Sequence, residues 1–273
     1  MISLIALALQ LNSAPPKTAP AKPTVSAPAP KAKPIVIVDA GHGGRDNGMD
    51  SPMASGKHLY EKNITLAVAK RLGAALTKRG AEVVYTRTTD TLIDLSDRGA
   101  IANKAGGALF ISIHVNASNP TWRDGPSMRG FETYFLSDAK TDDAQRVEEM
   151  ENASVKFETA KDISKEDPLS FILSDMKQNE HLRESAELAG TIQNSLGRVH
   201  TSLNRGVKQA GFRVLVTAFM PSVLVEIGFG TNAADAAFIS NPAKQDLMAA
   251  AIADGAMAYL SNYEHRLKGS SQR

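Results

Sequence analysis

Cysteine is absent from the 273-residue sequence, which excludes disulfide bonds, thiolate metal ligands and cysteine nucleophiles together. A surplus of one charge is also missing, because 31 lysine and arginine residues against 29 aspartate and glutamate residues leave a net charge of +2. This balance gives no reason to expect nucleic acid as a partner. Three catalytic signatures are absent as well: the GK[ST] end of a P-loop, the G-x-S-x-G elbow and the H-E-x-x-H helix. The hydrophobic content of 42% suits one globular domain with a sizeable core.

The N-terminal apolar run, MISLIALALQL, is too short to span a bilayer as a helix. It resembles the apolar core of a secretory signal peptide, so we expect residues 1–14 to be a signal peptide and the protein to be exported. No lysine or arginine precedes the run, which leaves a cytoplasmic protein with a fortuitous apolar start as the alternative. Residues 15–33 are dominated by proline, alanine and lysine. We expect a disordered linker there, because such a segment buries too little apolar surface to offset its ordering entropy.

The rest of the chain alternates between strand and helix patterns. Short apolar runs predict strands, and apolar residues at helical spacing predict helices between them. The predicted strands are 34–41, 81–87, 108–118, 129–137 and 221–232, and the predicted helices are 61–80, 94–106, 182–199 and 241–268. This alternation predicts a single three-layer α/β domain over residues 34–265, with helices on both faces of a sheet, followed by a flexible tail over 266–273.

One polar, charge-rich segment, residues 138–179, interrupts the alternation. Apolar residues at helical spacing on either side of Pro168 predict one or two amphipathic helices that lie outside the sheet. The alternative is a solvated excursion on the surface.

The stretch IVIVDAGHGGRDNG, residues 35–48, places a histidine among glycines directly after an apolar strand. Gly41 and Gly43 match the first two glycines of a dinucleotide-binding turn, but Asp46 stands at the third position, where the close packing of helix on strand requires glycine. The nucleotide interpretation is therefore poor, and a metal site is the better hypothesis.

His42 and His114 each lie at the end of an apolar strand. Because ligand sites in open α/β sheets gather at the carboxyl ends of the strands, the two imidazoles can face one another. Glu61 begins the following helix, so its carboxylate should project toward the same edge, although it could also serve only to favour the helix dipole. His58 is a rival ligand that this reasoning leaves open.

A set of two histidines and one glutamate with an open fourth position is typical of catalytic zinc, which lowers the pKa of bound water to about 7. Glu226 lies within the apolar strand predicted at 221–232. Burial raises the pKa of a carboxyl group, which suits a general acid and base. The alternative is a structural carboxylate held by backbone N–H groups or an arginine.

Six ordered motifs between about Ile35 and Leu260 resemble the zinc-dependent N-acetylmuramoyl-L-alanine amidases, the type-3 amidase family: IVIVDAGHGGRDNG, EKNITLAVAKRL, LFISIHVNAS, RGFETYFLS, NRGVKQAGFRVL and MPSVLVEIGFGTN. The resemblance implies a mixed sheet of about six strands with helices on both sides. It implies one zinc ion on His42, Glu61 and His114, with Glu226 as the catalytic residue. The implied reaction is hydrolysis of the amide between N-acetylmuramic acid and L-alanine in peptidoglycan, by a periplasmic or cell-wall-associated monomer, in wall remodelling or daughter-cell separation.

The resemblance also gives the 138–179 segment a role, because some periplasmic members carry a helical insertion that covers the zinc until a partner displaces it. We therefore expect autoinhibition by an acidic residue at the open zinc position, with Glu148, Glu149 and Glu151 as the candidates, and an activator protein that removes it.

Some candidates carry weaker signals. Arg205 lies in a motif of the family and, together with Lys208, could meet carboxylates of the stem peptide. Asn116 could bind substrate or only cap its turn. His181, His200 and His265 are expected at the surface.

Two other functions stay open at this point. One is a catalytically silent peptidoglycan-binding or regulatory module of the same fold. The other is a zinc peptidase or deacetylase that uses the same kind of site.

Overall fold

The computed structural model describes residues 32–52, 58–119, 121–122, 125–158 and 168–270. Contacts between Cα atoms divide the chain into two units, Met1–Ala32 and Lys33–Arg273, and the folded domain lies in the second. The predicted signal peptide and nearly all of the predicted linker therefore lie outside the described residues. Among the residues that are described, no helix is both long and apolar enough to cross a membrane.

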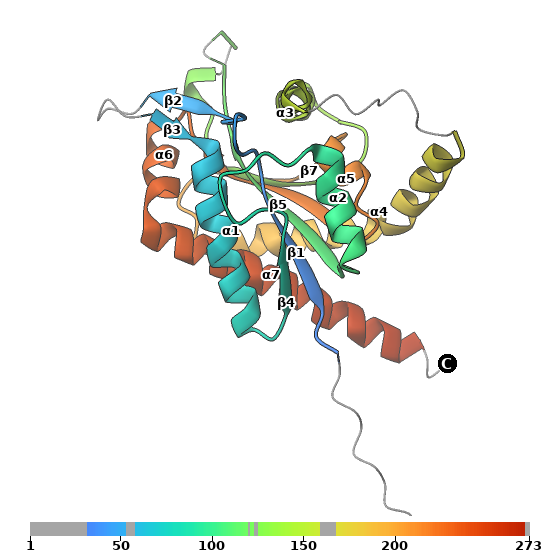
Figure 1. Cartoon of the computed structure of the whole chain (residues 1–273). Coiled ribbons are helices and arrows are strands. Elements are labelled where there is room, and N and C mark those ends of the chain that lie inside the picture. Colours follow the sequence, from blue (N-terminus) through green and yellow to red (C-terminus); the bar gives the residue numbers. More distant parts are fainter. Residues whose placement is uncertain (1–31, 53–57, 120, 123–124, 159–167, 271–273) are drawn as a thin grey trace, which may run out of the picture. The chain divides into compact units, whose positions relative to one another are not determined.

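A six-stranded mixed sheet forms the centre of the domain (Figure 1). Its order is β4 (Glu82–Tyr85), β1 (Ile35–Ala40), β5 (Leu109–Asn116), β8 (Ser222–Phe229), β6 (Phe131–Leu136) and β7 (Asn204–Ala210). All neighbouring strands run parallel except β6 and β8, which are antiparallel. The expected mixed sheet of about six strands is confirmed, and the first five strands in this order were all predicted. The edge strand β7 was missed because NRGVKQA offers almost no apolar alternation.

Helices cover both faces of the sheet, as the alternation predicted. One face carries α1 (Glu61–Lys78), α4 (Pro168–Leu196), α6 (Ala233–Ser240) and α7 (Pro242–Ser270). The other carries α2 (Leu95–Lys104) and the short α5 (Arg213–Val216). Two short helices, α5 and α6, were not predicted.

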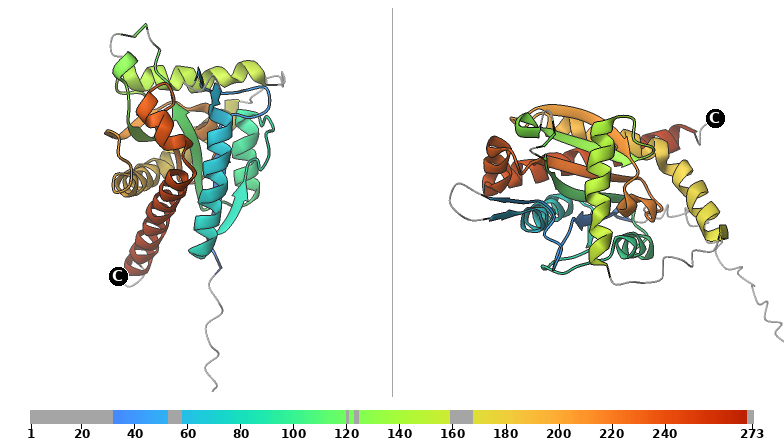
Figure 2. Two further views of the ribbon diagram at one scale, coloured as in Figure 1. Left: turned by 90° about the vertical axis from the view of Figure 1, so that its left-hand side faces the viewer. Right: turned by 90° about the horizontal axis from the view of Figure 1, so that it is seen from above.

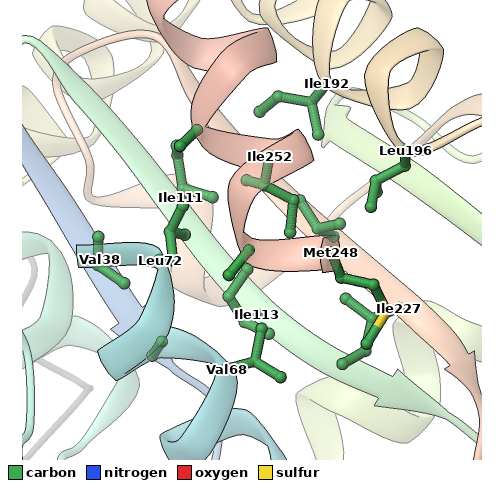
Figure 3. Packing of buried hydrophobic residues seen from close by; sticks show 14 of the residues in the cluster. Val38, Val68, Leu72, Ile111, Ile113, Ile192, Leu196, Ile227, Met248 and Ile252 are labelled. Carbon is green, nitrogen blue, oxygen red and sulfur yellow. The ribbon is translucent and has the colours of Figure 1, made fainter. Parts of the chain in front are cut away.

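The hydrophobic core lies on both sides of the sheet because adjacent residues of a strand point to opposite faces. Val38 and Ile111 pack into the larger cluster under α1, α4 and α7, as Figure 3 shows. Ile37 and Phe110 pack into the smaller cluster on the opposite face. Both faces of the sheet are thus buried, which explains why the sequences of the inner strands are continuous apolar runs.

Several element boundaries differ from those expected. The insertion was expected to end at residue 179, but helix α4 runs through this position. Leu182, the first residue of the helix predicted at 182–199, is 37% exposed. Helix α7 continues to Ser270, so residues 266–270 of the expected flexible tail are helical. A short antiparallel pair, β2 (Asp50–Pro52) and β3 (His58–Tyr60), joins the loop after β1 to α1, and two 3-10 turns, η1 (Gly125–Ser127) and η2 (Ala153–Phe157), were not foreseen.

The 138–179 segment contributes α3 (Asp142–Asn152). Thr141 caps its N-terminus, because its side chain accepts a hydrogen bond from the Ala144 amide. Ala144, Val147 and Glu151 are buried, so this helix is a packed element and not a solvated excursion. Figure 2 shows α3 lying across the carboxyl end of the strands. The insertion therefore covers the edge of the sheet at which the functional residues were expected.

Candidate metal centre

Four side chains that can hold a metal ion converge at this edge: His42, Glu61, His114 and Glu151. Each offers a ligand atom, all of these atoms lie within 4.8 Å of one another, and all four residues are buried. Three of them are the predicted ligands, and the fourth comes from the insertion.

The order of the strands explains why the two histidines meet. β1 and β5 are parallel neighbours, so His42, two residues beyond β1, and His114, near the end of β5, reach the same edge. Their ring centroids are 4.9 Å apart. Glu61 is the first residue of α1, and its Oε1 lies 3.1 Å from His42 Nε2 and 3.2 Å from His114 Nδ1.

Hydrogen bonds fix the orientation of these side chains. His42 Nδ1 pairs with Asp46 Oδ2 at 2.8 Å, which leaves Nε2 directed at the centre of the cluster. The amides of Val115 and Met49 donate to Oε1 and Oε2 of Glu61, each at 2.8 Å. The glutamate is therefore held in place by the backbone of two separate segments before any ligand binds.

The glycines of GHGGRDNG make room for the ligand side chains. A Cβ at Gly41 would lie 2.5 Å from Cε1 and Nε2 of His114, and one at Gly48 would lie 2.5 Å from Oε2 of Glu61. His42 itself has φ 60° and is the one non-glycine residue in the described part of the chain with positive φ. Such strain persists where the surrounding structure imposes it, commonly at functional sites.

Two buried arginines hold the backbone around His42 in this strained conformation. Arg98 donates to the carbonyl of Ala40 at 2.7 Å and to that of His42 at 3.0 Å, while it pairs with Asp39 at 2.8 Å. Arg87 donates to the carbonyls of Ala40 and Gly41 at 2.9 and 2.8 Å. The loop that presents His42 is thus anchored from the core side.

Several atoms of the cluster have no satisfying partner. Glu151 Oε2 lies 2.8 Å from His114 Nδ1 and 3.2 Å from His42 Nε2. Nevertheless all three atoms are buried and lack a hydrogen bond of acceptable geometry within the described residues. Lone pairs that converge on one point in this way fit a cation better than they fit one another.

The charges of the cluster shift the proton affinities of its members. Burial alone would lower the pKa of His114, but the Glu151 and Glu61 carboxylates outweigh it and raise this pKa to about 9. Burial likewise opposes a high pKa at His42, whose pKa is nevertheless raised well above its usual value, first by Glu61. Burial alone would raise the pKa of the Glu61 carboxyl. The two imidazoles outweigh it and hold this pKa far below its usual range. Without a metal, the raised pKa values therefore favour protons on the imidazoles of His42 and His114, which face the place proposed for a cation.

Glu226 lies in β8 beside His114 of β5 and opposite Glu132 of β6. It is fully buried, and neither carboxylate oxygen has a hydrogen-bond partner among the described residues. Burial, followed by the charges of Glu151 and Glu61, raises the pKa of Glu226 well above its usual value. Within the part of the chain that the structure describes, no amide or arginine donates a hydrogen bond to this carboxylate, so the structural alternative has no support there.

Of the three acidic candidates on the insertion, the structure brings only Glu151 to the cluster. Glu148 accepts a hydrogen bond from the Gly211 amide at 2.8 Å, and Glu149 is exposed beside Gln145. A cavity of about 400 Å³ opens beside Glu151 and is lined by His42 and Glu61, among others.

Comparison with known proteins agrees with this geometry. Residues 36–258 match the sequence model of the Amidase_3 family, N-acetylmuramoyl-L-alanine amidase. The chain belongs to this family. It is therefore a hydrolase of the N-acetylmuramoyl-L-alanine amidase type, as the resemblance of its motifs implied.

Individual amidases resemble the chain over most of its length. N-acetylmuramoyl-L-alanine amidase AmiA of Escherichia coli (strain K12) is 33% identical over 251 residues, which cover 89% of this chain and 84% of the relative. The crystal structure of an N-acetylmuramoyl-L-alanine amidase from Clostridium difficile 630 superposes with a TM-score of 0.62 at 30% identity, covering 84% of this chain and 97% of that one. The CwlD amidase from Clostridioides difficile, in complex with the GerS lipoprotein, gives 0.59 at 25% identity, with coverage of 84% and 99%.

The other predicted residues of the amidase are not members of the four-residue cluster. His58, the rival ligand, is exposed and pairs with Asp50 at 2.5 Å. Asn116 is fully buried and donates to Glu132 at 2.8 Å, and Arg205 donates to the same carboxylate at 2.7 Å. The expectation that His200 is a surface residue was wrong: it is buried, and its Nε2 lies 2.9 Å from the Ile227 carbonyl.

Sequence reasoning missed two carboxylates of the amidase site, Glu132 and Asp143. Glu132 stands in the apolar strand FETYFL just as Glu226 stands in SVLVEIGF, so the same signal could have found it. Asp143 is one of several acidic residues of α3, and nothing in the sequence pattern shows which other element this helix packs against. No local signal singles it out.

Proposed function

We propose that this amidase binds one zinc ion through His42, Glu61 and His114 and hydrolyses the amide between N-acetylmuramic acid and the L-alanine of peptidoglycan. The observation that carries the proposal is the convergence of these three buried residues: His42 Nε2 and His114 Nδ1 have no hydrogen-bond partner within the described residues, and Glu61 Oε1 lies within 3.2 Å of both. Two imidazoles and a carboxylate suit zinc, and three protein ligands leave a position for chemistry. A zinc ion in such a site polarises a carbonyl group and makes water acidic enough to attack near neutral pH.

Glu226 is the proposed catalytic residue. A carboxyl group with a raised pKa takes a proton from attacking water and returns it to the leaving amine more readily than one that stays ionised. Its position in the central strand β8, beside His114, keeps it fixed relative to the proposed ligands.

Helix α3 supports the further proposal that the enzyme is autoinhibited. Glu151 reaches both histidines and, in this proposal, takes the position that water and substrate would need. An activator protein would have to withdraw this helix, and the complex of the CwlD amidase with a lipoprotein shows that an amidase of this fold can bind another protein. Deleting residues 142–177 should raise activity on purified sacculi, whereas an unchanged or lower rate would contradict autoinhibition.

We also propose export to the periplasm or cell wall, which the nature of the substrate and the apolar N-terminal run support. We propose that the chain acts there as a monomer, in wall remodelling or in the separation of daughter cells. Fractionation of cells that produce the full chain should recover it outside the cytoplasm. Loss of the protein should leave cells in chains; normal separation would remove that part of the proposal.

Mass spectrometry of muropeptides released from sacculi tests the reaction itself. The deletion variant should release stem peptides with a free L-alanine amine and leave the glycan intact, and a chelator should stop the release. Zinc bound without release would indicate a catalytically silent module. Release of acetate would indicate a deacetylase, and cleavage within the stem would indicate a peptidase.

A further inference from the structure

A second buried carboxylate lies directly beside the proposed catalytic residue. Glu132 of β6 pairs opposite Glu226 of β8 and is fully buried. Its Oε2 accepts a hydrogen bond from Arg205 Nε at 2.7 Å and lies 2.6 Å from Lys208 Nζ. Two cations therefore meet one carboxylate at this point.

The second cation is not required to satisfy Glu132. Its Oε1 already accepts hydrogen bonds from Asn116 Nδ2 and the Tyr134 hydroxyl, each at 2.8 Å. One positive charge would neutralise the carboxylate, so either Arg205 or Lys208 is left with a surplus charge that needs another partner.

Helix α3 supplies that partner. Asp143 Oδ2 accepts hydrogen bonds from Arg205 Nη2 and from Lys208 Nζ, both at 2.6 Å. Asp143 lies eight residues before Glu151 on the same helix (151 − 143), which corresponds to about 12 Å along its axis. One helix thus places a carboxylate on the metal cluster and another on the pair of cations.

We propose that Arg205 and Lys208 form a subsite for a carboxylate of the peptidoglycan stem peptide, and that Asp143 occupies this subsite as a mimic while α3 is in place. The proposal rests on the function proposed above. When α3 leaves, the pair keeps one surplus positive charge and regains free donors. Even with α3 in place, the side chains of Arg205 and Lys208 are 17% and 18% exposed, so solvent reaches both of them.

The spacing indicates which carboxylate fits. An extended peptide advances roughly 3.3–3.6 Å per residue, so about 12 Å corresponds to three or four residues from the bond at the metal cluster. The subsite therefore selects stem peptides that carry a free carboxylate at that distance. The planar guanidinium of Arg205 gives directional, charge-assisted hydrogen bonds to such a group.

Two synthetic muramyl tripeptides, identical except that all stem carboxylates are free in one and amidated in the other, test the subsite. In the full chain with Glu151→Gln, kcat/KM for the free acid should exceed that for the amide by about tenfold or more, mainly through KM. Adding Asp143→Asn should increase kcat/KM for the free acid more than for the amide. Asp142→Asn, which changes the exposed neighbouring residue, is the matched control and should leave the ratio unaltered.

Removing the cations should abolish the preference. With Lys208→Met or Arg205→Gln, the acid-to-amide ratio of kcat/KM should fall to near one, and thermal melting shows whether each variant is folded. Asp143→Asn leaves every contact of Glu132 intact and keeps the test decisive if the cation variants do not fold. Equal rates on the two substrates, or a ratio that the cation variants do not change, would overturn the subsite. If neither substrate is cleaved, the proposed function fails instead, and calorimetric titration of the Glu151→Gln, Asp143→Asn chain with the free tripeptide still decides whether a carboxylate binds.

Discussion

The two sides of the proposed active site are built differently. On one side, His42, Glu61, His114 and Glu226 come from the loop directly after β1, the first turn of α1 and the central strands β5 and β8, and these residues are at most 6% exposed. On the other side, Glu151 is delivered by α3, which buries only Ala144 and Val147 beside it.

The contacts that hold α3 are largely polar and partly exposed. Glu148 and Asn152 bind the backbone around Gly211, and Asp143 binds Arg205 and Lys208. Partly exposed ion pairs each contribute little, typically about 0–1 kcal/mol. We therefore expect that α3 can leave without unfolding the sheet, whereas the proposed ligands can move only if the sheet or α1 moves with them. We call the four residues held by the sheet, its following loop and α1 the permanent side of the proposed site, and α3, whose withdrawal we propose, its removable side.

The sharpest way to break this comparison is a matched pair of glutamine substitutions. In the Glu151→Gln chain, Glu226→Gln should lower kcat by roughly 10²–10⁴-fold, because the proton-transferring group is lost. Release of stem peptides from sacculi measures this effect, and the zinc content should stay equal to that of the parent chain. Retention of more than about a tenth of the activity would remove Glu226 from the catalytic role.

Gly41→Ala tests whether the permanent side is as rigid as it looks. The added Cβ would overlap the His114 ring, so zinc affinity should fall about 100-fold, a loss at the upper end of those caused by changes around metal ligands. Competition with a chromophoric chelator measures the affinity. Gly190→Ala is the control, because a Cβ there meets nothing within 4 Å, and it should leave affinity unchanged.

Glu151→Gln tests the removable side. If the uncovered state is a minor population of at most about 10%, freeing the helix should raise activity on sacculi about tenfold or more. Glu149→Gln, two residues away and exposed, should have no effect. Equal rates for the two variants would show that Glu151 does not block the site.

The smallest predicted effect is a pH dependence of the stability of the metal-free protein. The pKa of His114 is raised to about 9 in the folded chain, so its contribution is fully present below the ordinary pKa of about 6.5 and is lost as pH rises through 9. The Tm in chelator should therefore fall by a few degrees between pH 6.5 and 9. The rise in Tm on adding zinc should grow over the same window, because metal and protons compete for the imidazoles. A rise in Tm on adding zinc that stays the same across this pH range would contradict the competition between metal and protons.

The positions of the residues on the permanent side could be predicted from the sequence, while their roles stay predictions. His42, Glu61 and His114 each follow a strong local pattern, a strand end or a helix start, and the parallel order of β1 and β5 follows from the same alternation. Glu226 was found because a carboxylate inside an apolar strand is unusual. These residues could be predicted since the periodicity that builds the sheet also places them.

The removable side could be predicted only in part. Resemblance suggested three acidic candidates on the insertion, but the choice of Glu151 depends on how α3 is rotated against the sheet, which its weak apolar stripe does not fix. The contacts of Asp143 with Arg205 and Lys208 depend in addition on β7, an edge strand without apolar alternation. Tertiary pairing of polar residues leaves no periodic trace in the sequence.

Anomalous diffraction at the zinc edge, from crystals of the full chain grown with zinc, tests the central claim most directly. We predict one ion within about 2.0–2.2 Å of His42 Nε2, a Glu61 oxygen and His114 Nδ1, with Glu151 completing its coordination. An ion bound elsewhere, for example at His58 and Asp50, or no ion at these residues, would contradict the account.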